Sequence, residues 1–416
     1  MTTFGFAFLL VLGLASALRL WLGMRHIAHV QAHRSAVPPH FSGDVSLEAH
    51  QRAADYTAAK TRLVLVSIVI DTALVLWLTF GGGVQLMYDM ASRWFDGDIL
   101  GGLALIALVS IVTTLVELPL GLYRTFKIEE RFGFNKMTPA LYWVDFAKNA
   151  ALAAALGLPL AACVLWLMRV AGDYWWIYAW GVWIVFNLIM LAAYPTWIAP
   201  LFNRFSPMQD PELRERVEKL LQRCGFKVKG LLVMDGSRRS SHGNAYFTGF
   251  GKSKRIVFFD TLLVRLTPPE VEAVLAHELG HFRLRHVVKR IIWIFLGSLV
   301  FLWLLDFAMR QEWFYAGLNV QARSTAVALV LFFLVVPSFT FLFQPLLSSY
   351  SRKHEFEADH YAARNASARD LVSALVKLYK DNASTLTPDP LHSAFYDSHP
   401  PALARIARLQ EAGQGL

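Results

Sequence analysis

Cysteine is scarce in this chain of 416 residues, which contains only Cys163 and Cys224. Two cysteines give no framework of disulfides and exclude a four-cysteine zinc site. Positive charge is also missing before the first hydrophobic run, because residues 1–5 contain no Lys or Arg. A cleaved signal peptide begins with a basic region. We therefore expect residues 4–24 to be a retained membrane anchor, although Ala15-Ser16-Ala17 resembles a cleavage site.

Apolar residues make up 55% of the sequence, above the roughly 45–50% that is usual in soluble domains, and the mean hydropathy is +0.40. A helix that crosses a bilayer needs about 20 mostly apolar residues. The pattern predicts a mainly α-helical, polytopic membrane protein with seven spans. They lie at about 4–24, 62–86, 100–123, 149–170, 175–199, 291–309 and 325–347.

The 40 Lys and Arg residues are unevenly distributed between the predicted loops. Five lie between the first two spans and five between the third and fourth, whereas the alternate loops hold one, one and two. Basic loops stay in the cytoplasm. We therefore expect the N-terminus outside and both the 200–290 segment and the C-terminus inside. The same distribution explains the net charge of +9, so we expect a lipid bilayer as partner and no nucleic acid.

Two regions are predicted. Residues 1–200 form an N-terminal membrane domain of five spans, in which Pro195 and Pro200 stop the fifth helix. Residues 201–416 contain spans six and seven and a small α+β domain. We expect an amphipathic helix at about 210–224, and strands at 230–234, 244–250 and 255–260 with a turn at 251–254.

A helix start is signalled at Thr267, where Pro268 suits the first turn and Glu270 completes a capping box. The sequence leaves open whether this helix continues into span six. It contains His277-Glu278-Leu279-Gly280-His281, in which the two histidines share one helical face. Both imidazoles can bind one zinc ion while Glu278 serves as general base. The alternative is a pair of surface histidines that binds no metal.

A catalytic zinc site needs a third protein ligand. A longer version of the motif would place glycine and histidine at positions that here are Leu284 and Val287. His286 is one residue away from that register, and we expect it to be a solvated helix residue. The third ligand must therefore be one of the downstream carboxylates, Asp306, Glu312, Glu355, Glu357 or Asp359.

Helix length favours Glu355. From His281 to Arg310 a helix rises about 44 Å, and from Arg323 to Glu355 it rises about 48 Å. If the residues between make a turn, Glu355 returns to the level of His281, while Asp306 and Glu312 lie at the far end.

Glu357 has a similar height, so spacing alone does not choose between it and Glu355. Asp359 lies four residues from Glu355 and can accept the free N–H of a zinc-bound histidine. The alternative is that these charges form a solvated helix face.

These features resemble the type I CAAX prenyl proteases, which are integral-membrane zinc metallopeptidases. The resemblance covers nearly the whole chain. It includes the segments 128–136, Ile-Glu-Glu-Arg-Phe-Gly-Phe-Asn-Lys, and 351–359, Ser-Arg-Lys-His-Glu-Phe-Glu-Ala-Asp, where the zinc-binding glutamate of the family matches Glu355. It also includes 241–247 and 398–401, followed by Arg405.

The resemblance implies seven helices around a water-filled chamber, one zinc ion, and proteolysis near the C-terminus of prenylated proteins. It further implies that Asn244 and His399 help to hold the substrate and the oxyanion. We also expect Tyr246, on a strand whose edge either pairs with the peptide or lies inside the sheet, to contact the substrate. Arg405 can bind a substrate carboxylate, or it is a surface arginine.

Two other functions share parts of this pattern. A transporter or channel could use a structural zinc site, and a quality-control protease without lipid specificity would use the same catalytic residues. The Ala-, Leu- and Arg-rich composition, with no evident retrieval signal, favours a bacterial inner membrane over the endoplasmic reticulum.

Overall fold

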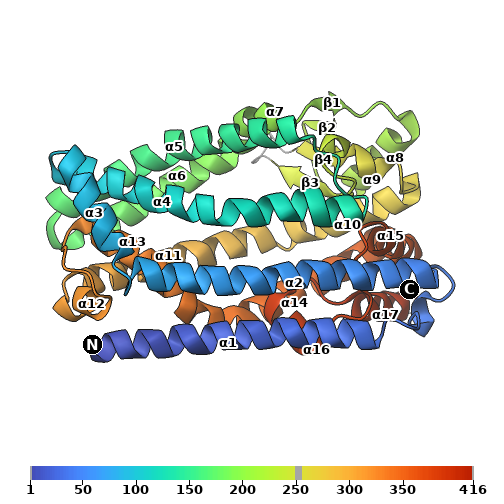
Figure 1. The fold of residues 1–416 in the computed structure, drawn as a ribbon. Helices are drawn as coiled ribbons and strands as arrows, with labels where there is room; N and C mark the ends of the chain where they lie inside the picture. The colour runs from blue at the N-terminus through green and yellow to red at the C-terminus, as the bar shows by residue number, and fades with distance from the viewer. Residues whose placement is uncertain (1, 249–254, 415–416) are drawn as a thin grey trace.

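The computed structural model describes residues 2–248 and 255–414 (Figure 1). Seven of the described helical segments are long and apolar enough to cross a membrane, which confirms the predicted number of spans. They lie side by side in an elongated bundle, with the sheet at one end. The segments comprise α1 (Thr3–Ala32), α2 (Leu47–Leu78), α4 (Asp98–Tyr123), α5 (Pro139–Val170), α6 (Trp175–Ala193), α11 (His286–Met309), and α13 (Thr325–Thr340) with α14 (Gln344–Asn365).

Two span boundaries differ from the sequence prediction. The second span ends at Leu78, and the chain turns through Gly82, whose φ of 78° is left-handed, into a separate helix α3 (Gly83–Trp94). The fifth span ends its regular α-helix at Ala193 but continues helically to Phe202, through a π-helical turn and α7 (Ala199–Phe202). Pro195 and Pro200 therefore do not end the helix as predicted, and each lies near the start of a new helical segment, Pro195 in the π-helical turn and Pro200 in α7.

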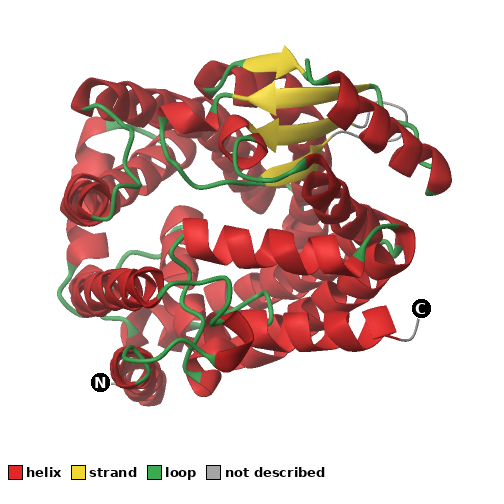
Figure 2. Cartoon of the chain, turned by 90° about the vertical axis from the view of Figure 1, so that its right-hand side faces the viewer, coloured by secondary structure: helices red, strands yellow, loops and turns green. Residues whose placement is uncertain are grey.

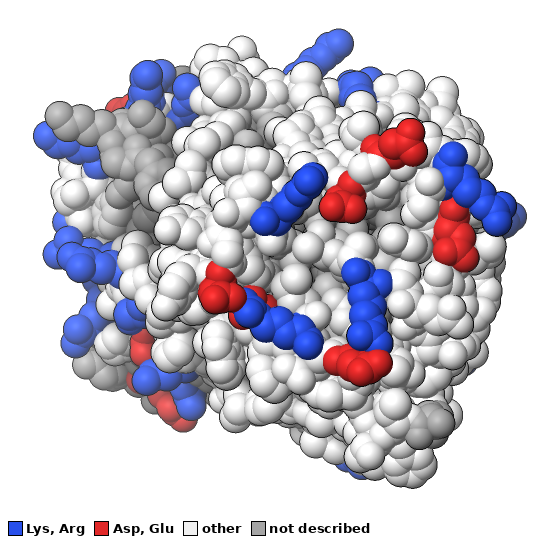
Figure 3. Space-filling model, turned by 90° about the vertical axis from the view of Figure 1, so that its left-hand side faces the viewer, with Lys and Arg blue, Asp and Glu red and all other residues white. Residues whose placement is uncertain are grey.

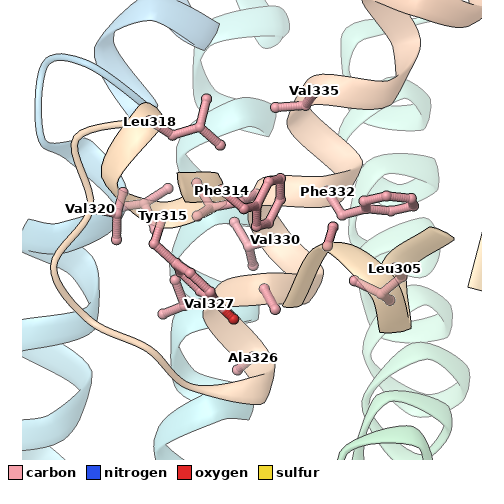
Figure 4. Packing of buried hydrophobic residues seen from close by; sticks show 14 of the residues in the cluster. Leu305, Phe314, Tyr315, Leu318, Val320, Ala326, Val327, Val330, Phe332 and Val335 are labelled. Atoms are coloured by element: carbon pink, nitrogen blue, oxygen red, sulfur yellow. The ribbon is translucent and has the colours of Figure 1, made fainter. Parts of the chain in front are cut away.

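A turn and a hydrophobic cluster at the opposite end hold α11 and α13 as a hairpin. The turn contains the short helix α12 (Glu312–Gly317), from which Phe314 points into the bundle. Phe314 and Leu318 are fully buried and pack near Val327 and Val330 of α13 (Figure 4). The predicted hairpin of spans six and seven is therefore held at its turn by buried hydrophobic contacts.

The predicted strands are confirmed. A four-stranded sheet has the order β1-β2-β4-β3, in which β2 and β4 are parallel and the outer pairings are antiparallel. The strand β3 lies at an edge, and among the described residues it pairs with β4 alone. The predicted turn at 251–254 and the last two residues of the predicted strand 244–250 lie outside the described residues. The strands are β1 (Phe205–Pro207), β2 (Gly230–Met234), β3 (Ala245–Thr248) and β4 (Arg255–Phe259).

The helix α10 (Pro268–Arg283), which carries the His-Glu-x-x-His motif and begins with the predicted capping box, packs against α8, α11, α14 and α15. Figure 2 views this end of the molecule, with the sheet and helices gathered together. The neighbours of α10 include α14, which supplies the 351–359 segment, and α8, which begins at the capping residue Asp210. The helices of this end that have not yet been given bounds are α8 (Pro211–Arg223), α15 (Ala368–Asp381), α16 (Pro390–Tyr396) and α17 (Ala402–Gln414).

Candidate active site

The helix α10 turns its two motif histidines toward α14. Its remaining residues explain this orientation, because Leu275, Ala276 and Leu279 are buried in the core between the sheet, α8 and α15. His277 and His281, one turn apart, bring their Nε2 atoms to 3.2 Å from one another. Glu278 is half-buried on the same helix.

Glu355 reaches the same point from α14. Its Oε2 lies 3.5 Å from His277 Nε2, and its Oε1 lies 3.3 Å from His281 Nε2. Ligand atoms bound to a tetrahedral zinc at about 2.0–2.2 Å stand roughly 3.3–3.6 Å from one another. Two imidazoles and one carboxylate at this spacing therefore fit a zinc ion and leave a fourth position open.

The second nitrogen of His277 faces Asp359, with Nδ1 2.8 Å from Oδ1. This carboxylate lies on the same face of α14 as Glu355. Burial lowers the pKa of His277, but hydrogen bonds to Asp359 and Glu355 outweigh it and raise that pKa to about 9. The surroundings of His277 therefore stabilise positive charge, which also suits a divalent cation.

Arg405 is committed to Asp359. Its guanidinium donates from Nη2 to Oδ1 at 2.6 Å and from Nε to Oδ2 at 2.8 Å, and the side chain is 6% exposed. A bidentate pair of this kind uses the fork that a substrate carboxylate would need. The structure therefore does not support the predicted contact of Arg405 with a substrate carboxylate, and it places this arginine behind Asp359.

His399 and Asn244 lie where solvent can reach them. His399 is exposed, in the loop between α16 and α17, and its Nδ1 is 2.7 Å from Glu355 Oε2. Asn244 precedes the edge strand β3, is also exposed, and accepts a hydrogen bond from Ala245 N at 2.8 Å through Oδ1. A peptide that approaches the metal position can therefore contact both His399 and Asn244.

Tyr246 faces away from the zinc helix. Phe247 packs against Phe282 of α10 at a ring distance of 4.9 Å, and neighbouring side chains of a strand point to opposite faces. The hydroxyl of Tyr246 lies 3.9 Å from Met234 Sδ on β2, and burial raises the pKa of Tyr246 to about 12. This position gives no support to the substrate contact of Tyr246, which stays a prediction.

Comparisons with known proteins agree with this arrangement. Residues 26–204 match the model of the CAAX prenyl protease N-terminal region with five membrane helices, and residues 207–413 match peptidase family M48. The CAAX prenyl protease 1 homolog of Arabidopsis thaliana is 34% identical over 89% of both chains. The chain is also similar to CAAX prenyl protease 1 of Saccharomyces cerevisiae, at 32% identity over 90% of this chain and 88% of the yeast protein.

The crystal structure of S. mikatae Ste24p superposes with a TM-score of 0.90, at 31% identity, over 98% of this chain and 99% of Ste24p. The chain belongs to the CAAX prenyl proteases of peptidase family M48. It is an integral-membrane metallopeptidase, and the transporter alternative is set aside. The water-filled chamber of the CAAX prenyl proteases stays a prediction for this chain.

His286 differs from the sequence-based expectation, and Glu357 is not among the candidate zinc ligands. His286 was expected to be solvated, yet it is 1% exposed and its Nδ1 lies 3.0 Å from His281 Nδ1. Glu357, the competing ligand candidate, turns away from the motif histidines of α10 and binds His286 Nε2 at 2.9 Å. The spacing of the longer motif tests His286 only as a third zinc ligand. It does not reveal a hydrogen-bond contact with His281.

A further set of residues positions the segment before β3 in this peptidase. Phe134, in the 128–136 segment, accepts a hydrogen bond from Ser241 N at 3.2 Å and stacks on His242 at 4.4 Å. The His242 ring also contacts Asn382, with Nδ1 3.2 Å from Oδ1. Both segments carry the resemblance to the family, but only the fold shows that they bind each other next to Asn244.

Proposed function

We propose that this chain is a zinc-dependent endopeptidase that cleaves near the C-terminus of prenylated or other membrane-associated proteins. The observation that carries the proposal is the convergence of two imidazoles and one carboxylate beside Glu278: the two Nε2 atoms lie 3.2 Å apart, and each has an oxygen of Glu355 at 3.3 or 3.5 Å. The names of the relatives, CAAX prenyl protease 1, support the substrate class.

His277, His281 and Glu355 would hold the ion. Zinc, when bound, polarises a substrate carbonyl and lowers the pKa of water. Glu278 then takes a proton from the attacking water and delivers it to the leaving amine. Asp359 accepts the Nδ1–H of His277 and fixes the ring, and Arg405 holds Asp359 in turn.

Substrate binding falls to the exposed residues. As an imidazolium, with Nδ1 donating to Glu355, the His399 ring can also donate from Nε2 to the negative oxygen that develops during attack. The outer edge of β3 can pair with an extended peptide, as sheet edges do in many peptide complexes. Asn244 stands at the start of that edge and can fix the position of the peptide along it.

The sheet and the zinc site belong on the cytoplasmic side in this proposal. The opposite end, shown in Figure 3, has few basic side chains, and acidic ones accompany them. Orientation follows the number of Lys and Arg residues in the loops, so an end with few of them is the one expected to be translocated. A bacterial inner membrane is the proposed location.

The experiment compares the parent protein with Glu278→Gln, both purified in detergent. The variant should retain its zinc but cleave a farnesylated C-terminal peptide at least about 100-fold more slowly, since general base catalysis is worth about 10²–10⁴. Normal cleavage by the variant would refute the role of Glu278. Equal rates for the farnesylated peptide and its unmodified twin would instead favour a protease without lipid specificity.

A further inference from the structure

We propose that His286 and Glu357 are positioning residues for zinc binding, which act through the ligand His281. The inference rests on the proposed zinc ligands and extends them by a hydrogen-bonded chain on the side away from Asp359. Its links are the 3.0 Å contact between His281 Nδ1 and His286 Nδ1 and the 2.9 Å contact between His286 Nε2 and Glu357 Oε2.

The ligand role of His281 sets the direction of each hydrogen bond. Its Nε2 faces Glu355 and His277, so this atom must keep its lone pair for the metal. The proton of His281 therefore stands on Nδ1 and is donated to His286 Nδ1. His286 then carries its own proton on Nε2 and donates it to Glu357. This single arrangement of protons gives every ring nitrogen of His281 and His286 a partner.

His286 is held firmly enough to orient a second ring. It is 1% exposed, and the His354 ring stacks on it at 4.0 Å with an interplanar angle of 8°. His354 is packed in turn against Tyr350 at 4.3 Å. A fixed acceptor limits rotation of His281 about its side-chain bonds, which is how outer residues raise the affinity of metal ligands.

A sharp bend in the backbone makes this contact possible. In one continuous helix, His286 would lie five residues after His281 and about 140° around the axis from it. Instead α10 ends at Arg283, and Arg285 adopts the left-handed conformation with a φ of 56° before α11 begins. The bend turns His286 back toward His281.

A second metal site explains these residues less well. His286, His354 and Glu357 do offer three ligand atoms within 4.8 Å of one another. However, an imidazole binds a metal in its ring plane, and the planes of His286 and His354 are nearly parallel and stacked. Their lone pairs do not converge on one point, whereas the chain to His281 uses both nitrogens of His286.

The test measures zinc affinity by competition with a chromogenic chelator, and the visible absorption of the Co²⁺-substituted protein. His286→Phe keeps the stacked ring but removes both nitrogens, and we expect the zinc dissociation constant to rise about 10–100-fold and the cobalt bands to shift. Glu357→Leu should shift both in the same direction, and Glu357→Gln, whose oxygen can still accept the Nε2–H, should restore most of the affinity.

The matched control is His354→Phe, which changes the neighbouring ring of the stack but not a contact of His281. It should leave zinc affinity within about twofold of the parent, well below the 10–100-fold expected for an outer-residue loss. If His286→Phe and Glu357→Leu behave like this control, the inference is wrong while the zinc ligands stand. A parent protein that binds no zinc, or a His281→Ala variant that binds it equally well, overturns the ligand set and this inference together.

Discussion

Gly280 of α10 packs directly against the backbone of Ala358 in α14. A methyl group added at Gly280 would stand 3.0 Å from Ala358 Cα and 3.2 Å from Ala358 O. Both neighbours are backbone atoms, which cannot rotate away as the end of a side chain can. The close approach of the two helices, and with it the position of Glu355 beside the histidines, therefore depends on the missing side chain.

Gly280→Ala should separate α10 from α14 and weaken zinc binding. Overpacking of this kind costs about 1–3 kcal/mol. If about 1.4 kcal/mol of that cost falls on the metal-binding geometry, the zinc dissociation constant rises about tenfold. Chelator competition measures the change. Gly297→Ala on α11 is the control, because no atom lies within 4 Å of the added methyl group, and its zinc affinity should equal that of the parent.

The same packing shows why sequence could place Glu355 only in part. Residue counts along two straight helices give a height, because each residue rises by a fixed amount. They do not give the rotation of α14 about its axis, which decides between Glu355 and Glu357. That rotation is set where Gly280 meets Ala358, a contact between segments 78 residues apart in the chain.

Local patterns predicted local structure well. The capping box at Thr267 and the apolar runs signalled the start of α10 and the seven spans, because these features depend on neighbouring residues. The surroundings of Tyr246 and His286 depend instead on how distant elements pack. The face of Tyr246 depends on how β3 packs against α10. The contact of His286 depends on the left-handed conformation of Arg285, which the sequence does not signal because the residue is not a glycine.

Arg405→Lys tests whether Arg405 supports Asp359. Lysine keeps the charge but cannot form the bidentate pair, so zinc affinity should fall about tenfold and kcat should fall with little change in KM. Arg405→Ala should be worse, because it leaves the carboxylate of Asp359 buried and unpaired, at a cost of about 3–5 kcal/mol in stability.

A peptide with a C-terminal amide separates this role from the sequence-based one. If Arg405 bound the substrate carboxylate, the Arg405→Lys variant would differ from the parent in KM, and the difference would vanish for the amidated peptide. We expect the reduction in kcat to be the same for both peptides.

Arg285 tests the bend between α10 and α11. A left-handed conformation costs an ordinary residue about 1–2 kcal/mol, whereas glycine adopts it readily. Arg285→Gly should therefore keep the zinc affinity, and its free energy of unfolding should lie within about 1 kcal/mol of that of the parent. Arg285→Val should lower the melting temperature and weaken zinc binding, because a β-branched residue resists this conformation. Equal zinc affinity in the two variants would contradict the proposed dependence of His286 on the bend.

Glu270 joins the zinc helix to α15. Its carboxylate accepts hydrogen bonds from Thr267 N at 2.8 Å, Ser373 Oγ at 2.6 Å and Lys377 Nζ at 2.7 Å. Burial alone would raise the pKa of Glu270, but these bonds outweigh it and hold the pKa below its ordinary value of 4.5. The ionised form is therefore favoured in the folded protein more than in the unfolded chain.

Stability from Glu270 should consequently be present above pH 4.5 and be lost as the pH falls through the lower pKa of the folded state. At pH 7, the free energy of unfolding of Glu270→Gln should be about 1–3 kcal/mol lower than that of the parent. Thermal unfolding followed between pH 7 and 3.5 should show this difference shrinking at the acid end, because protonation then removes the same charge from the parent. The control Glu212→Gln changes an exposed glutamate of α8. Its free energy of unfolding should stay within about 0.5 kcal/mol of that of the parent over the whole pH range. A difference for Glu270→Gln that is constant across this range would mean that the charge of Glu270 contributes nothing to holding α10 against α15.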